Sequence, residues 1–400
     1  MLAVSAALVA MLPAGLDAAA GTLPCPNLGG PVLLGPLAQK ENRLPHAARH
    51  ISGMAVSKDN SDATTGQQIV WVVGDRKANE AVQPENDRVY VFGYDDADGS
   101  LAIRFRLRPG VFPDDPANTG PPEPDGITSV ADSPNPVPDI EDLSIEYRAD
   151  ARDQLWLFDT GDNTTSRSQL NAYRLPEPDL TSTGLGLIGP AGTDLELEGK
   201  VEGMAIKPVR FPIKLWSNAQ KSQKVHPNIE TAFIDVGAPS VTKPIYLIPR
   251  APVDADGDGI KGELRLYRFD TREKFTPNHA TRSGWIESGG ANYEALGASI
   301  LPGGSAYAIR TGKANADRVL TFTREADRHI SAYIGDGNRA PACSWSTFDT
   351  EPSGNREETI AFDLTPAGET GWEGLLWSHD GTDFPPLYGA DVEVEPPPGG

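Results

Sequence analysis

One short phrase recurs along the chain and brings oxygen ligands to equivalent positions. It begins with serine or glutamate, continues with a small or polar residue, and then alternates apolar residues, as in "ISGMAVS" and "DIEDLSIE". The remaining copies are "KVEGMAIK", "NYEALGASILPGG" and "REETIAFDLTP". The residues that head the five copies are Ser52, Glu141, Glu202, Glu294 and Glu358.

These five residues have the chemistry of a calcium site if they meet at one point. Four carboxylates held together would repel one another and raise their pKa values, so a bound cation would stabilise the group. Oxygen ligands without histidine or cysteine suit calcium better than zinc or copper. The alternative for any single glutamate is a strand-end carboxylate bonded to backbone amides.

The elements that would bring the five residues together are the blades of a β-propeller. Each phrase is followed by a second strand: "QQIVWVVGDR", "DQLWLFDTGDN", "KPIYLIPR", "SAYAIRTGK" and "EGLLWSHDG". A third strand follows: "RVYVFGYD", "LNAYRLPEP", "LRLYRFDT", "RVLTFTRE" and, less regular, "PPLYGADVEV". In a propeller the innermost strands run along a central channel. The five phrase heads are therefore expected to face one another at the channel mouth.

The repeat predicts an all-β chain with five blades. Six blades are the alternative, and ordinary strands of a β-sandwich are a third interpretation. After Glu358 the chain has room for three strands only, so we expect "GPVLLGPLA" (30–38) to complete the last blade and close the ring. The segments 109–138 and 207–240 are interpreted as Gly/Pro-rich insertions.

The ends of the second strands lie on the same face as the starts of the first, because adjacent strands are antiparallel. Candidate catalytic residues at this mouth are Asp75, Arg76, Asp159, Asp162, Arg250 and Arg310. Neighbouring polar residues are Asn163, Lys313, His379 and Asp380. Carboxylates that hold a metal and orient water, with arginines that hold an anion, suit a metal-assisted phosphohydrolase. Loops on a propeller face are also polar by default, which is the alternative for each residue.

A second calcium candidate is the turn "DADGDGIKGE" in blade three. Asp254, Asp256 and Asp258 match the first half of a calcium loop. Position twelve is Arg265, so the turn is no EF-hand. A hairpin cage that also uses Glu263 would be structural, and an acidic turn without an ion is the alternative.

The phrases resemble those of two groups of proteins. The order of Ser52 and the glutamates, with "VVGDR", "IYLIPR" and "GASILPGG", is similar to the soluble calcium-activated apyrase family. That resemblance implies a five-bladed propeller, a central calcium and nucleotide diphosphohydrolase activity. Glu294 stands where that family has serine, and "DTGDNTTSR" replaces a Gly-rich segment. The phrases "SGMA", "DIEDLS" and "DTGDN…YRLPEP" resemble secreted actinobacterial propellers of uncharacterised function more closely.

Composition excludes several functions. A net charge of −21 without clustered Lys and Arg argues against a nucleic-acid partner. The chain has no G-x-S-x-G elbow, P-loop, Rossmann glycine pattern or H-E-x-x-H motif. "SHD" at 378–380 is contiguous and forms no triad by itself.

The ends of the chain indicate export. Residues 1–20 read as a signal peptide, 21–390 as one propeller domain and 391–400 as a Pro/Gly-rich tail. No further segment is long and apolar enough for a membrane helix, and we expect a monomer. Cys25 and Cys343 are the only cysteines, and in an oxidising compartment they suggest one disulfide.

Two functions of different class remain. The first is a secreted calcium-dependent hydrolase of a small phosphorylated molecule. It requires Arg76, Arg250 and Arg310 to converge beside the metal. The second is a non-catalytic propeller that binds a protein or glycan, with a structural central calcium. It requires those arginines to point apart or to be capped by carboxylates.

Overall fold

The fold is known from a computed structural model that describes the strands and some of the turns. The described residues are 25, 27–29, 32–36, 51–61, 68–74, 89–95, 101–107, 140–148, 151–161, 170–178, 196–198, 200–201, 204–205, 209–216, 228–238, 243–255, 257–270, 278–302, 304, 306–313, 316–323, 341, 343–346, 359–364, 372–378 and 386–393.

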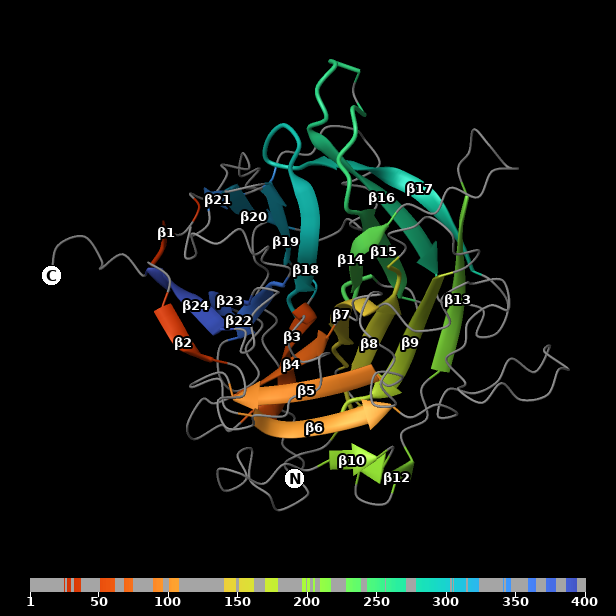
Figure 1. Cartoon of the computed structure of the whole chain (residues 1–400), viewed down its shortest axis with the longest axis vertical. Helices are drawn as coiled ribbons and strands as arrows, with labels where there is room; N and C mark the ends of the chain where they lie inside the picture. Colours follow the sequence, from red (N-terminus) through yellow and green to blue (C-terminus); the bar gives the residue numbers. More distant parts are fainter. Residues whose placement is uncertain are drawn as a thin grey trace, which may run out of the picture.

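The described elements are all strands, and they form a five-bladed β-propeller around a central axis (Figure 1). The innermost strands are β3 (Ile51–Ser61), β7 (Ile140–Glu146), β14 (Ile229–Ile234), β18 (Glu294–Ile300) and β22 (Ala361–Leu364). The second strands are β4 (Gln68–Gly74), β8 (Gln154–Asp159), β15 (Pro244–Pro249), β19 (Ala306–Lys313) and β23 (Trp372–Trp377). The predicted all-β propeller with five blades is confirmed.

The outer half of each blade continues the same antiparallel order. The third strands are β5 (Val89–Asp95), β9 (Leu170–Pro176), β16 (Glu263–Asp270), β20 (Ala316–Thr323) and β24 (Pro386–Glu393). The outer strands of blades 1 to 4 are β6 (Leu101–Leu107), β13 (Val209–Trp216), β17 (Asn278–Glu287) and β21 (Cys343–Ser346). Blades 2 and 3 are joined edge to edge because β13 pairs in parallel with β17. A short strand, β10 (Glu196–Glu198), pairs in parallel with β6.

One predicted strand was wrong. The phrase at 200–206 does not form the innermost strand of blade 3; β11 (Lys200–Val201) and β12 (Met204–Ala205) form a small separate sheet. The blade begins instead at β14, inside the segment 207–240, which also contains β13. The physical reason is the length of the connection: only residues 235–243 separate β14 from β15, with which it pairs, whereas the earlier phrase is separated from β15 by a segment that contains both β13 and β14. The other insertion, 109–138, lies outside the described residues.

The N-terminal segment closes the ring, as predicted. β1 (Asn27–Leu28) and β2 (Val32–Pro36) both pair antiparallel with β24, so they supply the outer edge of blade 5. Cys25, next to β1, forms a disulfide with Cys343 of β21, with a Cα–Cα distance of 5.4 Å. This bond ties the first strand to the outer strand of blade 4. A disulfide of this kind indicates a non-cytosolic protein.

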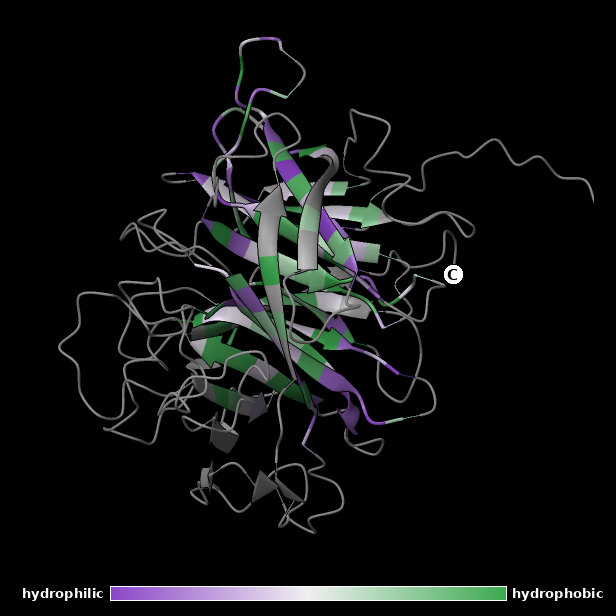
Figure 2. Ribbon diagram, turned by 90° about the vertical axis from the view of Figure 1, so that its right-hand side faces the viewer, coloured by the Kyte–Doolittle hydropathy of each residue, from purple (hydrophilic) through white to green (hydrophobic). Residues whose placement is uncertain are grey.

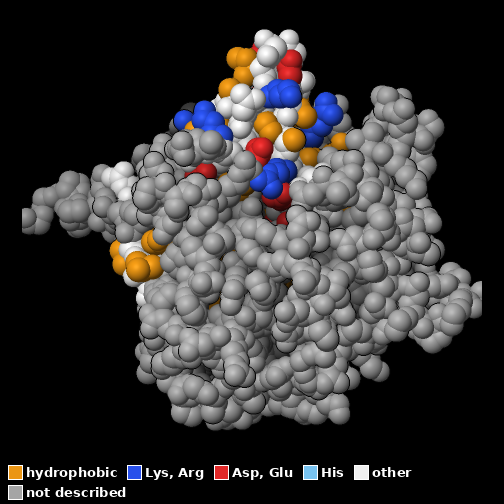
Figure 3. Space-filling model, in the orientation of Figure 1, with side chains coloured by type: hydrophobic (Ala, Val, Ile, Leu, Met, Phe, Trp, Pro, Cys, Tyr) orange, Lys and Arg blue, Asp and Glu red, His pale blue; other side chains and the backbone are white. Residues whose placement is uncertain are grey.

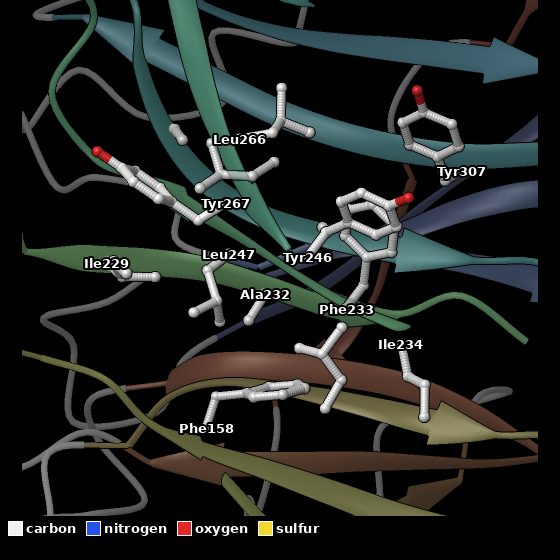
Figure 4. Close-up of a cluster of buried hydrophobic side chains, with 14 of the residues drawn as sticks. Phe158, Ile229, Ala232, Phe233, Ile234, Tyr246, Leu247, Leu266, Tyr267 and Tyr307 are labelled. Carbon is white, nitrogen blue, oxygen red and sulfur yellow. The ribbon is translucent and has the colours of Figure 1, made fainter. Parts of the chain in front are cut away.

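The core fills the spaces between successive blades. Most inner and second strands are buried on both faces, as in β8 and β15, so they read as continuous apolar runs rather than strict alternation. Figure 2 shows the hydrophobic colour along much of the sheets, with hydrophilic bands that alternate with it on some strands. Between blades 3 and 4, Phe233 packs on Tyr246 and Tyr307, with ring centroids 5.4 and 5.3 Å away (Figure 4). Within the described part of the chain, no helix could cross a membrane.

Candidate functional site

In three blades, a β-bulge at the mouth of the channel redirects one polar side chain. The pairing of the first and second strands skips one residue in blades 1, 2 and 3, and the skipped residues are Ser52, Glu141 and Glu230. A bulge leaves its extra residue outside the ladder and redirects its side chain. All three residues are buried. Glu230 therefore occupies in blade 3 the position that the sequence assigned to Glu202.

Glu230 is the mouth residue that sequence reasoning missed. The signal was present: an isoleucine precedes each bulge residue, at Ile51, Ile140 and Ile229. In blade 4 the skip falls two residues later, so Glu294 stays in the ladder opposite Gly312. Glu202, Glu358, Asp75, Arg76, Asp162 and Asp256 lie outside the described residues.

Arg250 joins two of these carboxylates. Its Nη1 donates to Glu230 Oε1 at 2.5 Å and its Nε to Glu294 Oε2 at 2.8 Å. Asn228 Nδ2 donates to the same Glu230 oxygen at 2.6 Å. Burial disfavours the charged guanidinium, but the two carboxylates outweigh it, so the pKa of Arg250 is raised. Arg250 thus neutralises Glu230 and Glu294.

The other candidate site residues that the structure describes form hydrogen bonds or ion pairs with residues other than Arg250. Arg310 is fully buried, and its Nη2 lies 3.4 Å from Asp317 Oδ2 while its Nη1 donates to the carbonyl oxygen of Thr359. Burial lowers the pKa of Arg310 to about 10, and Asp317 opposes that shift. Asp159 is buried and accepts a hydrogen bond from Asn171 Nδ2 at 3.1 Å. Ser52 Oγ donates to the carbonyl oxygen of Ile140 at 2.6 Å, which links blade 1 to blade 2.

A buried aspartate links two neighbouring blades just inside the mouth. Asp142 Oδ1 accepts the backbone N–H of Leu143 at 2.8 Å, and its Oδ2 accepts that of Ala232, on β14 of the next blade, at 2.9 Å. Burial raises the pKa of Asp142 well above its usual value, while the amides of Ala232, Leu143 and Ala298 act the other way. Asp142 holds blades 2 and 3 together around the axis.

The predicted calcium turn forms a hairpin that projects from the molecule (Figures 1 and 3). Asp254 accepts the backbone N–H groups of Gly257 and Gly259 at 2.7 and 3.1 Å, and Asp258 accepts that of Ile260 at 2.7 Å. Gly257 and Gly259 have φ values of 85° and 86°, which favour glycine. Backbone N–H groups of the loop therefore already donate to carboxylate oxygens of Asp254 and Asp258. Calcium binding by this turn remains a prediction.

A different acidic group lies between blades 1 and 2. Asp59, near the end of β3, Asp153, before β8, and Glu177, after β9, each place a carboxylate oxygen within 4.8 Å of the others. Within the described part of the chain, this is the single set of three or more acidic, histidine or cysteine side chains so arranged. The group lies at the end of the propeller away from the mouth, since β3 begins at the mouth near Ser52 and β8 ends there at Asp159.

Burial dominates the electrostatics of this group. Burial raises the pKa of Asp153 to about 7; the amide of Arg148 lowers it, and the charges of Asp59 and Glu177 raise it further. Burial also raises the pKa of Glu177, against hydrogen bonds from Ser57, Trp71 and other donors. The group can hold a metal ion, or a proton in its place. Sequence reasoning missed it because none of its members heads a repeated phrase, although Asp153 and Glu177 lie inside the segments "DQLWLFDTGDN" and "LNAYRLPEP".

No protein-family model matches the chain, and no curated protein matches it. A solved structure of the Dos1 propeller is similar with a TM-score of 0.31 and 10% identity over 82% of this chain and 52% of that chain, so this chain spans about half its length. The Malassezia sympodialis allergen Mala s 1 gives 0.40 and 13% over 88% and 98%. A putative 6-phosphogluconolactonase from Bacteroides uniformis gives 0.30 and 13% over 90% and 71%.

Proposed function

We propose that this chain is an exported, non-catalytic β-propeller that binds a protein partner with its mouth face. The observation that carries the proposal is the capture of Arg250 by Glu230 and Glu294. A phosphohydrolase needs a cation directed at its substrate, and here the guanidinium is committed to two carboxylates of the same mouth. Arg310 supports the same view because it is fully buried beside Asp317.

The projecting hairpin supports a macromolecular ligand. It begins at Arg250, so it rises from the mouth, and its tip carries Ile260 with half of its surface exposed. An exposed apolar residue at the tip of a polar hairpin is a suitable contact for a protein surface. The hairpin therefore gives the mouth face a protruding apolar residue, Ile260, and the charged residue Arg250 where the hairpin begins.

A phosphatase assay tests the non-catalytic part. The purified chain is incubated with nucleoside diphosphates, phytate and p-nitrophenyl phosphate, with calcium and with EGTA. We expect phosphate release at the background rate under all conditions. Calcium-dependent release that disappears in Arg250→Ala but persists in Arg268→Ala, whose residue pairs with Asp270 on β16, would overturn the proposal.

A binding assay tests the other part. The chain and its Ile260→Ser variant are screened against arrays of extracellular proteins and of defined glycans. We expect protein ligands whose binding is weakened by Ile260→Ser and unchanged by Leu33→Ser, an exposed residue on the edge of blade 5. Binding confined to the glycan array would contradict the choice of partner.

A further inference from the structure

We propose that Asp59, Asp153 and Glu177 bind one hard divalent cation of the calcium class at the junction of blades 1 and 2. This site is separate from the channel mouth and independent of the function proposed above. Asp59 belongs to blade 1, while Asp153 and Glu177 belong to blade 2. A cation here would hold the two blades together at the end of the propeller opposite the mouth, which the mouth residues do not reach.

The free carboxylate oxygens carry the argument. Glu177 Oε1 accepts hydrogen bonds from Ser57 Oγ, from Asn60 Nδ2 at 2.8 Å and from Trp71 Nε1 at 2.6 Å. The second oxygen, Oε2, is buried and has no hydrogen-bond partner among the described residues. The first oxygen is therefore saturated and fixes the side chain, and the second is left for a ligand.

The two carboxylate oxygens of Asp153 differ in the same way as those of Glu177. Its Oδ1 accepts the backbone N–H of Arg148 at 2.6 Å, and its Oδ2 is buried without a partner in the described part of the chain. Asp153 is fully buried and Glu177 is 3% exposed. A buried carboxylate oxygen without a partner is costly, and two in one group are costlier because their charges repel. A cation between them removes both costs.

The surroundings hold the carboxylates in place. The backbone N–H of Asp153 donates to Asp59 Oδ2 at 3.0 Å, and that of Glu177 donates to the carbonyl oxygen of Asp153 at 2.9 Å. Arg152 directs its guanidinium to the carbonyl oxygens of Glu177 and Pro178, at 3.2 and 2.5 Å, and to Asn60 Oδ1 at 3.0 Å. These bonds preorganise the group, as outer partners do in metal sites.

The ligands select the class of cation. Three carboxylates without histidine or cysteine suit a hard ion. Calcium binds oxygens at about 2.3–2.6 Å, so it spans ligands up to about 5 Å apart, and the oxygens of this group lie within 4.8 Å of one another. Magnesium demands shorter octahedral bonds and keeps several waters. Calcium therefore fits with the least rearrangement.

Terbium luminescence gives a direct readout, since Trp71 donates to Glu177 and is adjacent to the site. The chain is stripped with EGTA and titrated with Tb³⁺, with excitation of tryptophan, and Ca²⁺ is then added in competition. We expect sensitised emission with one ion per chain that calcium displaces. Asp153→Asn and Glu177→Gln should weaken binding at least about 10-fold. The controls Asp254→Asn and Glu294→Gln should bind like the wild type.

Thermal unfolding separates lost binding from lost folding. Calcium should raise the Tm of the wild type and leave that of Asp153→Asn unchanged. Without metal, Asp153→Asn should melt at or above the wild-type Tm, because it removes one charge from a crowded buried group. A wild-type Tm insensitive to both calcium and EGTA overturns the proposal in favour of a shared proton. Calcium binding that Asp254→Asn abolishes and Asp153→Asn preserves overturns it in favour of the hairpin.

Discussion

Replacing Asp142 should lower the stability of the fold, because this residue connects blades 2 and 3 near the centre of the propeller. Its two carboxylate oxygens accept the N–H of Leu143 in its own blade and of Ala232 in the next. Asp142→Ala leaves both amides without their acceptor in a fully buried place. Each buried unsatisfied amide costs about 1–3 kcal/mol, so the free energy of unfolding should fall by about 2–6 kcal/mol. That is a large part of the roughly 5–15 kcal/mol of a typical domain.

Two matched variants should lose less stability than Asp142→Ala. Asp142→Asn keeps one acceptor and turns an amide group toward the other N–H, so it should cost about half as much, about 1–3 kcal/mol. Ser144→Ala, two residues along β7, removes an acceptor that lies 3.4 Å from the N–H of Ile234, and should cost about 1 kcal/mol or less. Urea unfolding followed by tryptophan fluorescence gives the three values. An Asp142→Ala variant within about 0.5 kcal/mol of wild type would refute the reasoning.

The same residue predicts a pH dependence. Burial raises the pKa of Asp142 in the folded state, so the native chain holds a proton that the unfolded chain loses above about pH 4. The contribution of Asp142 to stability is thus complete below the unfolded pKa and is lost as pH rises through the folded pKa. As the pH rises above about 4, the wild type should lose more stability than Asp142→Asn. Parallel curves for the two proteins would contradict the assignment.

Three further changes test the framework. Gly53→Ala should destabilise by about 1–3 kcal/mol, because its Cβ would lie 2.3 Å from a backbone nitrogen of β7; chemical denaturation measures it. Cys25→Ser should lower stability by about 5 kcal/mol, since the bond to Cys343 closes a long loop, and reductant should then have no further effect on the Tm. Glu230→Gln should cost about 1.5–3 kcal/mol through its arginine partner, as measured by urea unfolding, and an unchanged free energy of unfolding would contradict that pairing.

Local pattern was sufficient for most of the framework. Short apolar strands between turn residues predicted every second and third strand, and the small remainder after Glu358 predicted closure by the N-terminal strand. Cys25 and Cys343, the only two cysteines, suggested one disulfide, and the structure contains that bond. These features depend on neighbours in sequence or on a single choice of partner, so a pattern can specify them.

For the start of blade 3 the repeat predicted the phrase at Lys200, and the segment at Ile229 was interpreted as part of an insertion. The hairpin to β15 and the bulge at Glu230 select the later phrase, and both depend on backbone pairing. The roles of Arg250 and Glu294 changed for the same reason. Once Glu230 stands in the mouth, the arginine expected to hold a substrate is held by the protein.

The sequence by itself indicated an all-β chain of repeated strand units and favoured five blades, because strand periodicity is a local property. Only the tertiary structure decided which oxygens meet. Asp59, Asp153 and Glu177 come from a strand end, a turn and a strand exit in two blades, and they converge because the blades pack face to face. Such contacts between segments distant in sequence leave no repeated signal, since each residue is ordinary in its own segment.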